Sequence, residues 1–200
     1  MFSARFKQFE ADISRTRDLV GLGQVIGNMT LGRVDASDVF RASLVQAVAA
    51  MDFYVHGVVL DRAVDILLGR CGPGSRTKLG LNFGAIADLL KTSSPVEKEI
   101  LARTYTAERL ALETFQRPDD IGAAFAMIGI PKIWSSAFVD KAGETKAALG
   151  VIVTRRNNIV HSCDNDPVNF GTTFDLNDTE ALEAIGTIYR IIESINQYCQ

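Results

Sequence analysis

Residues 44–60 read LVQAVAAMDFYVHGVVL, and this run decides the fold class. Only Gln46, Asp52 and His56 interrupt its apolar side chains. A helix that is apolar almost all round lies in the interior of a protein, because no face of it suits water. The helical pattern extends to both sides of the run, so we predict one long helix over residues 37–68 at the centre of a bundle.

The rest of the chain also predicts helices. Apolar residues recur at helical spacing, and glycine, proline or capping residues separate the segments. The predicted segments are residues 3–26, 83–90, 95–115, 119–127, 132–140, 144–161 and a last helix from residue 177. No stretch reads as a convincing β-strand, and no internal repeat is found. We therefore expect an all-α helical bundle that forms a single domain over residues 1–200.

The composition sets limits on function. Of the 200 residues 47% are hydrophobic, which is enough for a sizeable core, and the net charge is −3. No overall basic field therefore attracts nucleic acid, and any contact with RNA must come from a local or an assembled surface. Cys71, Cys163 and Cys199 form no C-x-x-C pair, and no acids or histidines show metal-ligand spacing, so we expect no disulfide framework, metal or cofactor. Asp52 and His56 argue against a membrane helix, and we expect a cytoplasmic protein.

The segment Arg155–His161, RRNNIVH, ends the helix predicted over residues 144–161. Around this helix one polar stripe consists of Gly150, Thr154, Asn157, Asn158 and His161. Arg155 and Arg156 instead lie within the apolar side. A guanidinium cannot lose its proton, so a buried one needs a counter-charge. The simplest arrangement pairs Asp52 with Arg155 or Arg156; the alternative is that the helix frays and both arginines reach solvent.

His161 relates differently to its two polar neighbours. Asn157 lies four residues before it and can hydrogen-bond the imidazole. Arg156 lies five residues before it, or about 140° away around an ideal helix, so the two side chains do not meet within one straight helix. Either the helix ends before His161 or a second copy of the chain completes the group. The small residues Gly150 and Thr154 on the same stripe favour close approach of another helix.

An arginine and a histidine together suit one kind of chemistry. The histidine can give or take a proton near neutral pH, and the arginine can hold a phosphate and stabilise charge on its oxygens. This pair suits RNA cleavage in which the ribose 2′-hydroxyl attacks the adjacent phosphate, and it requires no metal ion.

Two stretches resemble the HEPN superfamily. Residues 156–161, RNNIVH, are similar to its R-x4-6-H motif near the end of a late helix, and residues 40–56 are similar to the second helix of the subgroup associated with ribosomal L-PSP proteins. The resemblance implies a dimeric helical bundle with a shared cleft and metal-independent endoribonuclease activity, often in toxin–antitoxin or anti-phage systems. It implies catalytic roles for Arg156 and His161, support from Asn157, and a subgroup-specific helical insertion over residues 71–140.

Two other interpretations remain open. The first is a non-catalytic helical module that partners a nucleotidyltransferase or a larger defence protein, which the acidic net charge favours slightly. The second is a structural dimer in which Arg155 and Arg156 merely pair with Asp52. If the protein cleaves RNA and the cleavage depends on His161, the ribonuclease interpretation is supported over both alternatives.

Overall fold

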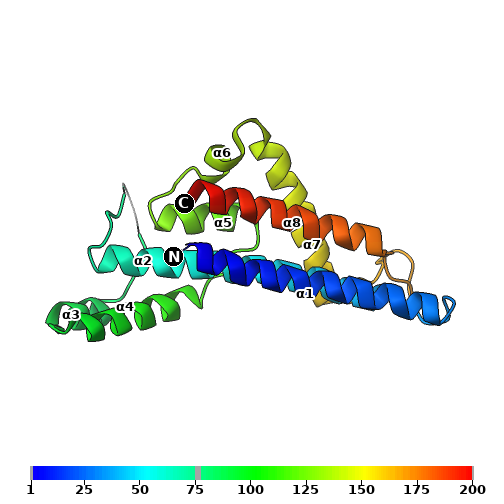
Figure 1. Cartoon of the computed structure of the whole chain (residues 1–200), viewed down its shortest axis with the longest axis horizontal. Coiled ribbons are helices and arrows are strands. Elements are labelled where there is room, and N and C mark those ends of the chain that lie inside the picture. Colours follow the sequence, from blue (N-terminus) through cyan, green and yellow to red (C-terminus); the bar gives the residue numbers. More distant parts are fainter. Residues whose placement is uncertain (1, 75–77, 200) are drawn as a thin grey trace.

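A computed structural model describes residues 2–74 and 78–199, and the chain is helical almost throughout (Figure 1). The helices are α1 (Phe2–Met29), α2 (Ser37–Leu67), α3 (Phe83–Lys91), α4 (Pro95–Leu110), α5 (Pro118–Met127), α6 (Ile133–Phe138), the 3-10 helix η1 (Val139–Lys141), α7 (Ala142–Ser162) and α8 (Asp178–Cys199). Within the described ranges the only β pairing is an isolated bridge between Asn165 and Thr173. The predicted all-α class is confirmed.

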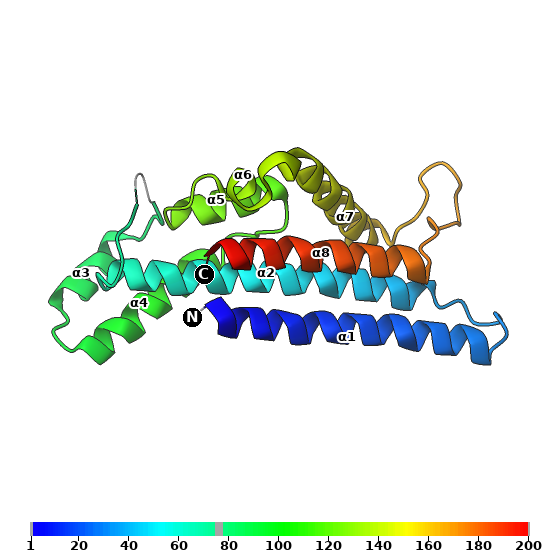
Figure 2. The same ribbon diagram turned by 45° about the horizontal axis from the view of Figure 1, so that its top comes forward.

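Helix α2 is the centre of the bundle, as its apolar run predicts. It packs against α1, α8, α4, α7 and α5, and α1, α2 and α8 run side by side along the long axis of the molecule (Figure 2). Four large side chains on its inward side are at most 1% exposed: Leu44, Met51, Tyr54 and Val58. By length and composition α2 is apolar enough to cross a membrane, but 61% of its most apolar window is buried inside the bundle. That burial is compatible with the core helix of a soluble protein.

Some helix boundaries follow the local signals, and others differ from the predicted ends by three to five residues. The first helix continues three residues beyond the predicted end at residue 26, through Gly27. The start of α8 is a capping box, in which the Glu180 amide donates to Asn177 Oδ1 (2.9 Å) and the Asn177 amide donates to Glu180 Oε2 (3.1 Å). The predicted helix over 95–115 ends earlier, at Leu110, and a short connection leads to α5. The reciprocal cap stabilises the start of α8, one of the long helices that pack on α2.

The region of residues 71–140 is helical but divides into two parts. Helices α3 and α4 lie together at one end of the molecule (Figure 1), where Val64, Leu89 and Ala102 form a small second core. Helices α5 and α6 pack instead beside α7 and α8. There Trp134 is 8% exposed, and its indole nitrogen donates to the Pro118 carbonyl oxygen at 2.8 Å. This second part forms one wall beside α7, the helix that carries the Arg155–His161 segment.

Candidate functional site

Helix α7 keeps its helical form through the whole Arg155–His161 segment. It ends at Ser162, and the next two residues adopt left-handed conformations with φ of 51° and 56°. The carbonyl oxygen of Asn158 accepts hydrogen bonds from the Ser162 hydroxyl (2.7 Å) and from the Asp164 amide (3.1 Å), which closes the last turn. The arrangement in which the helix ends before His161 is therefore excluded.

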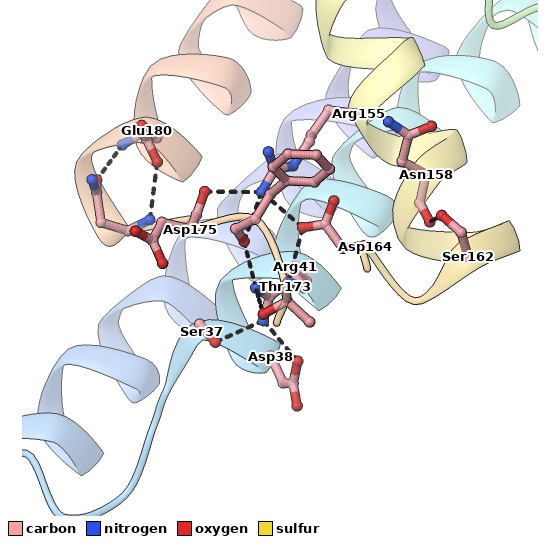
Figure 3. A network of polar contacts seen from close by, with 12 residues as sticks. Ser37, Asp38, Arg41, Arg155, Asn158, Ser162, Asp164, Thr173, Asp175 and Glu180 are labelled. Atoms are coloured by element: carbon pink, nitrogen blue, oxygen red, sulfur yellow. Dashed lines mark hydrogen bonds and ion pairs between the residues drawn. The ribbon is translucent and has the colours of Figure 1, made fainter. Parts of the chain in front are cut away.

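Arg155 is half-buried and is held by the loop that follows α7. Its Nη2 donates to Asp164 Oδ2 at 2.7 Å (Figure 3). The same nitrogen donates to the carbonyl oxygens of Phe174 (3.1 Å) and Asp175 (2.9 Å), and the guanidinium lies 5.5 Å from the centre of the Phe174 ring. Arg155 thus has its counter-charge in Asp164, and it joins α7 to the loop of residues 163–177.

Arg41, in the first turns of α2, is a second cation on Asp164. It is 6% exposed, and its Nε donates to Asp164 Oδ2 at 3.0 Å. Its Nη1 and Nη2 donate to further acceptors on Ser37, Asp38, Thr173 and Phe174 (Figure 3). Burial alone would lower the pKa of Arg41, but hydrogen bonds to Asp164 and Asp38 outweigh it and raise the pKa, so the group stays a cation. We call Arg41, Arg155 and Asp164 the clasp.

The clasp was not predicted from the sequence. Asp164 follows α7 among turn-forming residues and indicates only a helix stop. The one local signal for Arg41 is Asp38 three residues earlier, on the same face of a helix. Nothing local links residue 41 to residue 164, which are 123 positions apart in the chain.

Arg156, Asn157 and His161 have few partners. Arg156 Nη1 donates to Asn157 Oδ1 at 3.0 Å. His161 is exposed, and its side chain makes no hydrogen bond within residues 2–74 and 78–199, so the contact with Asn157 that the spacing allowed is not formed. Arg156 and His161 point about 140° apart around α7. One copy of the chain therefore leaves both groups separate and available.

The predicted contact between Asp52 and these arginines is wrong. Asp52 lies midway along α2, where its Oδ1 accepts the Phe115 amide (2.7 Å) and its Oδ2 accepts Gln116 Nε2 (3.1 Å). The end of α7 meets α2 at Arg41 instead, about 16 Å from Asp52 along the helix axis. Helix direction explains the error, because α7 brings its carboxyl end toward the start of α2 and not toward its middle.

Buried polar atoms without partners gather at the end of α7. Four buried side-chain atoms in the described chain lack a hydrogen-bond partner, and three of them are Arg155 Nε, Arg156 Nε and Asp164 Oδ1. Such an atom costs about 1–3 kcal/mol unless water or a ligand satisfies it, and each one calls for an explanation. Their concentration here makes this end of α7 the strongest candidate site in the described residues.

An exposed ridge runs along α7 toward this site. Its members are spaced by three or four residues, and all are exposed: Ala147, Val151, Thr154, Asn158 and His161. A mainly apolar groove toward α8, which includes Leu44, Ile152 and Leu176, flanks one side. A polar groove toward the start of α5, which includes Arg117 and Asn157, flanks the other. Ridges bordered by grooves are the surfaces through which helices pack on one another.

Neither a metal site nor a known relative assists the interpretation. No group of three or more His, Cys, Asp or Glu side chains is placed to hold a metal ion in residues 2–74 and 78–199. Comparisons of the chain with protein-family models, with curated proteins and with solved structures found no match.

Proposed function

We propose that this protein is an endoribonuclease that needs no metal ion and acts as a homodimer, with Arg156 and His161 as catalytic residues. One observation carries the proposal. Both side chains lie in the last two turns of α7. Within residues 2–74 and 78–199 neither forms an ion pair or a hydrogen bond with another element, whereas Arg155 beside them does. The R-x4-H spacing and the HEPN resemblance agree with these roles.

The chemistry follows from the two groups. The Arg156 guanidinium holds the scissile phosphate and stabilises the negative charge that builds on its non-bridging oxygens. His161 takes the proton of the ribose 2′-hydroxyl or supplies a proton to the leaving 5′-oxygen. As the 2′-oxygen bonds to phosphorus, the bond from phosphorus to the 5′-oxygen breaks, which leaves a 2′,3′-cyclic phosphate and a 5′-hydroxyl. Asn157 supports this step by holding the guanidinium through its hydrogen bond.

A second copy of the chain is proposed to complete the site. Because Arg156 and His161 diverge around an unbroken helix, a phosphate held by one of them is remote from the other in the same copy. The ridge of α7 has the spacing of a helix-pairing surface, and Val151 at its middle is 71% exposed. Gly150 beside it has no atom within 4 Å of the position that a Cβ would take, so another helix has room to approach.

Cleavage of a fluorescently labelled single-stranded RNA in the presence of EDTA tests the proposal. Wild type is expected to cut, and His161→Ala and Arg156→Ala are each expected to lose about 100-fold or more of the rate. His56→Gln is the matched control, because it removes the other histidine, which packs on Phe115 remote from α7's end. Unchanged cleavage in the first two variants, with folding checked by circular dichroism, would refute the proposed roles.

We place this activity, in line with the HEPN resemblance, in a cytoplasmic toxin–antitoxin or anti-phage system. An antitoxin would then be the natural partner. The alternative proposal is a non-catalytic module that binds a nucleotidyltransferase or a defence protein, which the net charge of −3 favours because RNA is repelled by a negative surface. A purified dimer that binds such a partner but never cuts RNA would support the alternative.

A further inference from the structure

We infer that Asp164 is a positioning residue for the proposed active site, which it holds at a fixed rotation about the axis of α7 through Arg155 and Arg41. The inference rests on the proposed function, because it concerns the side chains of Arg156 and His161. It is carried by the geometry of the clasp and by how little else holds the end of α7.

The end of α7 has few anchors in the core. Its buried residues are Leu149, Ile152 and Val153, and none of the residues from 154 to 162 is buried. Ile159 is partly buried and packs against the core. Apart from this contact and the continuity of α7, the last two turns, which carry Arg156 and His161, depend on polar contacts for their position. In residues 2–74 and 78–199 the ion pair that ties these turns to the rest of the bundle is the clasp.

The clasp is built as a fixed support. Asp164 is 0% exposed, and the two guanidinium groups approach its Oδ2 at 2.7 and 3.0 Å. Two consecutive left-handed residues turn the chain inward to bring this carboxylate beneath α7, a conformation that non-glycine residues adopt only at a cost. Arg41 is held in turn by the start of α2 and by the returning half of the loop (Figure 3).

The direction of Arg155 determines the directions of its neighbours. A helix is stiff over two turns, so Arg156 lies about 100° and His161 about 240° around the axis from Arg155. With Arg155 drawn toward Asp164, both proposed catalytic groups must project away from the clasp. Removal of the carboxylate leaves Arg155 without its counter-charge beside Arg41, which keeps, within the described residues, only the ion pair with Asp38. Arg155 then moves away, and the last turns lose their fixed rotation.

The chain contains a matched control for this inference. Asp61 is also a carboxylate shared by two arginines, with Arg5 Nε at 2.9 Å and Arg103 Nη1 at 2.8 Å, and its side chain is 10% exposed. It joins α1, α2 and α4, far along α2 from the end of α7. Asp61→Asn therefore removes an ion pair of the same kind without touching the proposed site.

Asp164→Asn and Asp61→Asn, each in the full chain, are compared by RNA cleavage kinetics and by amide hydrogen exchange, at a temperature where both remain folded. Asp164→Asn is expected to lower kcat at least tenfold with KM changed less than threefold, and to speed exchange of the amides of residues 158–163 at least tenfold. Asp61→Asn is expected to leave kcat and those amides within twofold of wild type. If Asp164→Asn does not fold, Arg155→Gln replaces it, because the Arg155 side chain is 26% exposed and Asp164 keeps Arg41 as its partner.

The two readouts separate this inference from the proposed function. If wild type never cuts RNA but the amides of the last turn are released by Asp164→Asn alone, the positioning role stands and the enzymatic proposal fails. Unchanged exchange in Asp164→Asn, or an equal effect of Asp61→Asn on kcat or on those amides, overturns the positioning role.

Discussion

Substitution of Asp52 by alanine separates the sequence-based expectation from the structure. The sequence-based expectation makes Asp52 the counter-charge of Arg155 or Arg156, so that its loss would disturb the candidate site. In the structure, Asp52 ties α2 to the connection between α4 and α5 by accepting the amide of Phe115 at 2.7 Å and the side chain of Gln116 at 3.1 Å. We expect Asp52→Ala to lower stability and to leave RNA cleavage by the folded protein unchanged.

The magnitude follows from the groups left unpaired. Phe115 is 2% exposed, so its amide loses its acceptor in a place that water reaches poorly, at a cost of about 1–3 kcal/mol. The half-exposed Gln116 side chain adds about 0.5–1 kcal/mol. A total of about 1.5–4 kcal/mol corresponds to a fall in Tm of about 3–16 °C for a chain of this size. Asp52→Asn keeps an acceptor oxygen for the amide and should lose less than half as much.

Urea unfolding followed by circular dichroism measures the loss, and a double-mutant cycle with Arg155→Ala tests the link to α7. The two substitutions should be additive to within about 0.5 kcal/mol, because the side chains share no partner. The reasoning is refuted by a stability loss below about 0.5 kcal/mol, by clear coupling to Arg155, or by loss of cleavage in a folded Asp52→Ala protein.

Three further predictions concern the dimer, the pH dependence and the thiols. Val151→Arg should weaken the dimer and cleavage together in analytical ultracentrifugation and kinetics, whereas Val96→Arg, equally exposed at 71%, should change neither. Burial alone would raise the pKa of Asp61, but hydrogen bonds from two arginines hold the pKa below its usual value. The ionised Asp61 therefore stabilises the fold above about pH 4, and this contribution is lost as the pH falls through the lowered pKa. The Tm difference between wild type and Asp61→Asn should therefore shrink below about pH 4; a constant difference would contradict the shift. Burial raises the pKa of Cys199 to about 11, so iodoacetamide at about pH 8 should modify the exposed Cys163 first, as read by mass spectrometry.

The elements of the fold were predictable because their signals are local. The apolar run of residues 44–60 predicts a buried helix without reference to the rest of the chain. Asn177 and Glu180 indicate a helix start by their spacing alone. Such signals depend on hydrogen bonds and side-chain spacing inside one element. The packing of α3 and α4 against the far end of α2 has no comparable signal, because it arises from apolar side chains that many arrangements could bury.

The need for a counter-charge could be predicted from the sequence, but the residue that supplies it could not. The prediction that an arginine on the apolar side of α7 pairs with a carboxylate holds for Arg155, whose partner is Asp164, whereas Arg156 donates only to Asn157 within the described part of the chain. Asp52 was the natural choice, since a carboxylate inside the most apolar helix also needs a partner. The prediction of Asp52 was wrong because it depends on which part of α2 lies beside the end of α7. Side-chain periodicity shows which face of a helix is buried, but it does not show where along its length another helix packs.

Asp164 shows why such a partner is hidden. Its carboxylate reaches Arg155 because two left-handed residues reverse the chain directly after α7. This conformation costs a residue such as Cys163 about 1–2 kcal/mol, whereas aspartate tolerates it better. Neither residue 163 nor residue 164 is glycine. The strain is offset by contacts that form only when α2, α7 and the loop of residues 163–177 pack together. The left-handed conformation of residues 163 and 164 is therefore not favoured by the local sequence alone. A glycine at residue 163 would adopt the left-handed conformation without strain. We therefore expect Cys163→Gly to stabilise the fold by about 1 kcal/mol in thermal unfolding, and Cys163→Val to destabilise it. A loss of stability in the glycine variant would show that the turn is held by the cysteine side chain and not by the clasp that it serves.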